Sequence, residues 1–170
     1  MTHSIHDELL KRAEAYVQSR GLSIDLQYPL GSGIDGCVWR TSRASALKLC
    51  ERLKNYQDEA ECYRRFRLAR VDRIQGFAVP KLIDADDSLM AIEMSIVRRP
   101  FLLDFGKVYL DSPPPYWSDG EIMANWHTEG GENFGQHWAM VLSLIRQLES
   151  YGIWYVDPKP GNVMFGEESK

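Results

Sequence analysis

The chain has 170 residues, of which 44% are hydrophobic and 26% charged, as in an ordinary water-soluble globular domain. A net charge of −4 gives no electrostatic basis for binding nucleic acid. Its three cysteines, Cys37, Cys50 and Cys62, lack the C-x-x-C spacing of zinc sites, so we expect reduced thiols in a cytoplasmic protein. No apolar run approaches the length of a membrane span, so we expect no membrane partner.

The first predicted element is an amphipathic helix over residues 4–20, where apolar residues recur at helical spacing. Ser4 followed by Asp7 resembles a capping box, and Gly21 suits the position just after the last turn. We expect this helix, within residues 1–22, to pack against the following part of the chain rather than to carry chemistry.

A glycine-rich segment, GSGIDG at residues 31–36, follows a strand that we predict over residues 24–30. The pattern G-x-G-x-x-G occurs in dinucleotide-binding folds, where the third glycine opens a helix, and in kinases, where a strand follows. Here Gly36 precedes strand-forming residues, a polar turn and a further strand over residues 44–50. The alternation of strands and turns favours the kinase-type loop.

The strand over residues 44–50 carries Lys48 between apolar neighbours. A lysine in such a position is costly unless its ammonium group has a partner. The helix predicted over residues 53–70 places Glu59 on its apolar face and Glu61 on the opposite face. We therefore expect an ion pair between Lys48 and Glu59.

Two more strands are predicted over residues 79–84 and 89–94, with a turn at residues 86–88 between them, which brings the expected number of strands to five. We interpret residues 112–117, which include three consecutive prolines, as a stiff extended crossing of the surface. The letters DFG at residues 104–106 are interpreted as a coincidental tripeptide near a helix or turn.

A helix predicted over residues 134–151 leads into YVDPKPGNVMF at residues 155–165. Two prolines and a glycine stiffen this loop, which carries an acid, a cation and an amide in Asp157, Lys159 and Asn162. The loop resembles the catalytic loop of protein kinases, H-R-D-x-K-x-x-N, and it follows the glycine-rich loop and the lysine strand in kinase order.

The resemblance implies a protein-kinase-like α+β fold in one domain. A five-stranded antiparallel small lobe would cover residues 23–96, and a connecting segment with a reduced helical large lobe would cover residues 97–170. The cofactors would be ATP and Mg²⁺, with Asp157 as general base, Lys159 steadying the transferring phosphate and Asn162 as a metal ligand. The resemblance also implies a set of nucleotide-binding residues: Gly31, Gly33, Gly36, Val38, Lys48, Glu59, Glu93 and Met94. Glu93 and Met94 would act through their backbone, at the hinge between the lobes.

The position of the DFG letters departs from the kinase pattern. In kinases the metal-binding D-F-G aspartate follows the catalytic loop, whereas here the tripeptide precedes that loop by about fifty residues. Three interpretations stay open: a minimal phosphotransferase acting on a protein or small molecule, an inactive pseudokinase that binds nucleotide or a protein, and a truncated chain. The retained Lys48, Asp157 and Asn162 favour the first, and a minimal form could cover its helical face as a homodimer.

Overall fold

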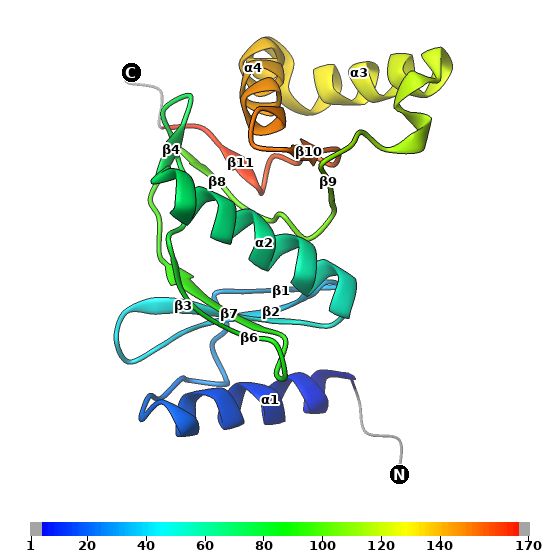
Figure 1. Ribbon diagram of the computed structural model, residues 1–170. Helices are drawn as coiled ribbons and strands as arrows, with labels where there is room; N and C mark the ends of the chain where they lie inside the picture. Colours follow the sequence, from blue (N-terminus) through cyan, green and yellow to red (C-terminus); the bar gives the residue numbers. More distant parts are fainter. Residues whose placement is uncertain (1–4, 167–170) are drawn as a thin grey trace.

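The computed structural model describes residues 5–166, so Ser4 and its expected capping role lie outside the described residues. The chain forms an α+β fold with mainly antiparallel sheets. Helices α1 and α2 lie on opposite sides of a central sheet, and the remaining strands and helices lie beyond α2 (Figure 1). Among the helices described, none is both long enough and apolar enough to cross a bilayer.

The central sheet has five antiparallel strands in the order β1-β2-β3-β7-β6. They are β1 (Gly31–Gly33), β2 (Gly36–Arg40), β3 (Ser45–Cys50), β7 (Ala91–Ser95) and β6 (Leu82–Asp86). The sequence predicts a sheet of this size, but the strand expected over residues 24–30 is wrong. The backbone turns there because the Asp25 side chain accepts a hydrogen bond from the Gln27 N–H, while Ile24 makes an isolated bridge with Thr41.

Each face of the central sheet is covered by one helix. The helix α1 (Ile5–Ser19) packs its apolar side chains against the sheet face that carries Trp39, Leu47 and Leu49. The helix α2 (Leu53–Ala69), close to its predicted bounds, covers the other face. The buried residues of α2 are Tyr56, Glu59, Ala60, Cys62, Tyr63 and Phe66.

Beyond α2, two segments far apart in the sequence lie side by side. The strand β8 (Phe101–Leu102) pairs with β11 (Val163–Met164), and β9 (Val108–Leu110) pairs with β10 (Ile153–Tyr155), both in antiparallel orientation. The strands β4 (Arg73–Ile74) and β5 (Phe77–Ala78) extend the first pair into a sheet of order β11-β8-β5-β4. The segment after β8 therefore lies beside the loop that precedes β11.

The chain between β9 and β10 is helical. It comprises η1 (Pro115–Ser118), α3 (Gly120–Phe134), η2 (Gly135–His137) and α4 (Trp138–Glu149). The helix predicted over residues 134–151 is found as η2, α4 and the turn after α4, whereas α3, which ends at Phe134, was missed. Its many exposed positions and three glycines weaken the helical pattern, although the Asp119 side chain caps its first turn by accepting from the N–H groups of Glu121 and Ile122.

Candidate functional site

A cleft of about 540 Å³ lies between the central sheet, α2 and the segment that follows β7. The glycine-rich loop forms one wall, and most of the remaining lining is apolar. Four of its polar side chains, Lys48, Glu59, Asp104 and Asn162, are joined by hydrogen bonds. Its apolar lining residues include Leu30, Val38, Ala46, Met94, Phe101 and Leu103.

Lys48 is the buried cation of this cleft. Its Nζ donates to Glu59 Oε2 at 2.6 Å and to Asp104 Oδ1 at 3.3 Å. The ion pair predicted between Lys48 and Glu59 is thus confirmed, with the two side chains 12% and 1% exposed. Burial alone would lower the pKa of Lys48, but the charges of Glu59 and Asp104 outweigh it and raise that pKa, so the ammonium group stays charged.

Asp104 corrects the sequence interpretation. The tripeptide at residues 104–106 is not a coincidental surface turn, because Asp104 lines the cleft and also accepts a hydrogen bond on Oδ2 from Asn162 Nδ2 at 3.1 Å. The pairing of β8 with β11 places both residues just beyond the ends of adjacent strands. Burial alone would raise the pKa of Asp104, but Lys48 and the Gly106 N–H outweigh it and hold that pKa below its ordinary value.

The glycines of the loop divide into two groups. Gly36 has a φ of +142°, and a Cβ built there would lie 2.0 Å from the carbonyl oxygen of Leu49. Gly31 and Gly33 are exposed in β1, where an added Cβ would meet no described atom within 4 Å. Gly36 is therefore required for close packing of β2 on β3, whereas Gly31 and Gly33 leave space open at the cleft wall.

The difference between Gly36 and Gly33 can be measured as a change in stability when each is replaced by alanine. We expect Gly36→Ala to lower the free energy of unfolding by more than about 1 kcal/mol, because both its backbone conformation and its contact with Leu49 are incompatible with a side chain. Gly33→Ala serves as the matched variant and should stay within about 0.5 kcal/mol of the wild type. Urea denaturation of both variants gives the comparison, and equal losses would contradict the division.

The side chain of Glu93, a residue expected to act through its backbone at the hinge, does not line the cleft. Its buried carboxylate pairs with Arg43 and accepts hydrogen bonds from Ser45 and, at 2.8 Å, from the Tyr16 hydroxyl of α1. Successive residues of a strand point to opposite faces, so Met94 lines the cleft while Glu93 faces α1. Burial alone would raise the pKa of Glu93, but these hydrogen bonds outweigh it and lower that pKa.

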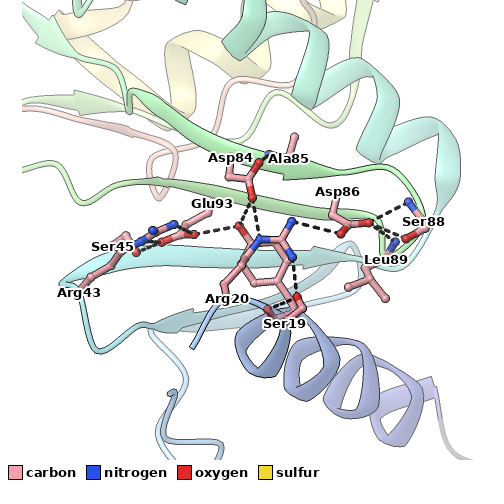
Figure 2. Close-up of polar contacts among 11 residues, drawn as sticks. Ser19, Arg20, Arg43, Ser45, Asp84, Ala85, Asp86, Ser88, Leu89 and Glu93 are labelled. Carbon is pink, nitrogen blue, oxygen red and sulfur yellow. Dashed lines mark hydrogen bonds and ion pairs between the residues drawn. The ribbon is translucent and has the colours of Figure 1, made fainter. Parts of the chain in front are cut away.

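The same polar network continues along α1 and attaches it to β6. Arg20 lies over the ring of Tyr16 at 3.8 Å, and its Nε lies 2.7 Å from Asp84 Oδ2. Its Nη2 lies 3.2 Å from Asp86 Oδ2 (Figure 2). These contacts fix α1 to the sheet on the face away from the cleft.

The loop predicted as catalytic is held by hydrogen bonds near both ends, but only part of it lines the cleft. Its Asn162 does so, whereas Asp157 and Lys159 are not among the described lining residues. Lys159 Nζ lies 2.9 Å from Asp157 Oδ2, and the two side chains are 55% and 41% exposed. Trp126 Nε1 of α3 donates to the carbonyl oxygen of Val156 at 2.8 Å, which holds the start of this loop.

Lys107 and Asn55, which both bind Asp35 of the glycine-rich loop, were not identified from the sequence. Lys107 Nζ lies 2.9 Å from Asp35 Oδ2, and Asn55 Nδ2 of α2 donates to Asp35 Oδ1 at 2.9 Å. Asp35 lies in the turn between β1 and β2 and lines the cleft. The aspartate inside the GSGIDG motif was the only sign of this contact in the sequence, and it did not indicate which residues would bind it.

The cleft offers some, but not all, of the oxygen ligands that a hard cation such as Mg²⁺ needs. The described residues contain no group of three or more His, Cys, Asp or Glu side chains that could hold a metal by themselves. Asp104 and Asn162 do offer oxygen donors, the kind that Mg²⁺ prefers when waters and phosphates complete its shell. Comparison with models of protein families and with curated proteins finds no match to this chain.

Proposed function

We propose that the chain is a kinase-like phosphotransferase that binds ATP in the cleft and transfers its terminal phosphoryl group to a hydroxyl of a protein or small molecule. One observation carries the proposal: Lys48, Asp104 and Asn162 converge in a cleft whose other walls are apolar. Phosphoryl transfer depends mainly on positioning and charge neutralisation, which this combination supplies.

The two parts of the cleft match the two parts of a nucleotide. Apolar side chains such as Val38, Ala46 and Met94 suit a flat base, and residues 95–97, at the end of β7 and just after it, also line this part of the cleft. Gly31 and Gly33 let backbone N–H groups approach phosphate closely, and the Lys48 ammonium group neutralises it.

Asp104 and Asn162 are the residues that would hold magnesium. Mg²⁺ held there would neutralise part of the phosphate charge. The sequence resemblance lacked a carboxylate for this role because the tripeptide at residues 104–106 precedes the catalytic-type loop. Pairing of β8 with β11 supports this role for Asp104, because it brings Asp104 within hydrogen-bonding distance of Asn162 even though Asp104 comes first in the sequence.

Asp157 would accept the proton of the attacking hydroxyl, and Lys159 beside it would steady the transferring phosphate. One observation favours a second candidate function, a nucleotide-binding module without catalysis. Asp157 and Lys159 pair with each other at 2.9 Å, and neither is among the residues that line the cleft. Turnover measurements separate the two functions.

Calorimetric titration with ATP, in the presence and absence of Mg²⁺, tests the cleft. We expect Lys48→Ala to weaken ATP binding at least about tenfold under both conditions, because it removes a charge-assisted contact to phosphate. We expect Asp104→Ala to abolish only the gain in affinity that Mg²⁺ gives, because it removes a metal ligand and keeps the lysine.

Lys11→Ala is the matched control, since it removes the same charge from an exposed position on α1, on the other side of the sheet. Its ATP affinity should equal that of the wild type. A folded wild-type protein that binds no ATP with or without Mg²⁺ would contradict the proposed function.

A further inference from the structure

Lys107 is a second lysine beside the cleft: it is not among the described lining residues, but it pairs with Asp35, which is. It follows Asp104 by three residues, and its ammonium group lies 2.9 Å from Asp35 at the turn of the glycine-rich loop. The other oxygen of Asp35 accepts a hydrogen bond from Asn55. The turn of the loop is thereby attached both to α2 and to the segment that carries Asp104.

The charges around Lys107 come from the same residues that the proposed function uses. Its hydrogen bond with Asp35 raises its pKa most, and the negative charges of Asp157 and Asp104 raise it further. The ammonium group is therefore within electrostatic reach of both the proposed base and the proposed metal ligand. A phosphoryl group passing from nucleotide to acceptor would have to lie in the same region.

The two lysines differ in how firmly they are held. The Lys48 side chain is 12% exposed and shared between two carboxylates, whereas that of Lys107 is 44% exposed and has one direct carboxylate partner among the described residues. A partly exposed lysine–carboxylate pair is weak, and the flexible stem of lysine lets its ammonium group turn to a new partner. A doubly charged terminal phosphate is a stronger partner than one carboxylate.

We propose that Lys107 makes this cleft selective for nucleoside triphosphates over diphosphates. In the nucleotide-free chain Lys107 pairs with Asp35, and on binding it moves to the terminal phosphate. Asp35 is thus a competitor for Lys107 that the triphosphate must displace. The inference rests on the proposed function and adds a specificity-determining residue to it.

The test compares the affinities of ATP and ADP at the same free Mg²⁺ concentration, by calorimetry. We expect Lys107→Ala to weaken ATP binding about tenfold or more and to change ADP binding less than twofold, because ADP lacks the phosphate that Lys107 contacts. We expect Asp35→Asn, which keeps an acceptor for Asn55, to strengthen ATP binding severalfold without changing ADP binding. Lys11→Ala again controls for the loss of one positive charge.

Lys107→Met keeps the apolar stem and replaces the alanine variant if circular dichroism shows that the latter is misfolded. Equal weakening of ATP and ADP, or no change in either, would overturn the role of Lys107. Weaker ATP binding in Asp35→Asn would show that Asp35 does not compete with the terminal phosphate for Lys107. If the wild type binds both nucleotides while Lys107→Ala keeps their affinity ratio, this inference fails and the proposed function stands; if the wild type binds neither, both fail.

Discussion

Replacing Asp157 by asparagine is expected to slow phosphoryl transfer by about a hundred- to ten-thousandfold while leaving ATP affinity unchanged. Asparagine has nearly the same shape as aspartate but cannot take a proton from the attacking hydroxyl. Nucleotide contacts should persist because Asp157 is not among the described residues that line the cleft. Turnover of ATP in a coupled assay, and ATP affinity by titration, are the two measurements.

A matched control for this variant is Asp72→Asn. Asp72 is 57% exposed and lies 3.1 Å from Lys81, much as Asp157 lies 2.9 Å from Lys159, but it is not among the residues that line the cleft. Its turnover should equal that of the wild type. Equal turnover in wild type and Asp157→Asn, or none in either at any metal concentration, would favour the nucleotide-binding module over the enzyme.

Phe105→Ala is expected to lower the free energy of unfolding by about 3–5 kcal/mol. Phe105 is fully buried and makes edge contacts with three rings, of Tyr63, Phe66 and Tyr155, at centroid distances of 5.5, 5.2 and 5.7 Å. Small domains are stable by only about 5–15 kcal/mol, so this loss is a large fraction of the total. Urea denaturation followed by circular dichroism measures it.

Two further variants show whether the loss comes from the buried ring. Tyr28→Ala removes an aromatic side chain that is 74% exposed and should change stability by less than about 0.5 kcal/mol. Phe105→Leu keeps an apolar side chain and should fall between the alanine variant and the wild type. A Phe105→Ala protein as stable as Tyr28→Ala would show that the segment after β8 does not pack on α2 as described.

The features that the sequence predicted correctly depend on residues that are close together in the chain. The Lys48–Glu59 ion pair spans 11 residues, and it follows from one strand, one helix and the cost of burying an unpaired ammonium group. The size of the central sheet follows in the same way, from short runs of strand-forming residues separated by turns.

Features that depend on the face of a strand or on distant pairing could not be predicted. The expectation for Glu93 and Met94 concerned their backbone at the hinge, and it did not include the network in which the Glu93 side chain pairs with Arg43 and Tyr16 on the other face of the sheet. Asp104 reaches the cleft through the pairing of β8 with β11, and two-residue strands carry no periodic signal in the sequence. The helix α3 buries only Gly130 and Phe134, so it too lacks a continuous apolar stripe.

The pairing of β8 with β11, two strands far apart in the sequence, affects the order in which we expect the chain to fold. Asn162 meets Asp104 across 58 residues, whereas Lys48 meets Glu59 across 11. Closing the longer loop costs more chain entropy before any contact compensates for it, and non-local pairing is slow for the same reason. The lysine and its glutamate can therefore form early with α2, and the aspartate–amide pair forms late. A partly opened molecule would lose its carboxylate–amide pair first and keep its buried ammonium group, so metal binding would report on complete folding of the chain.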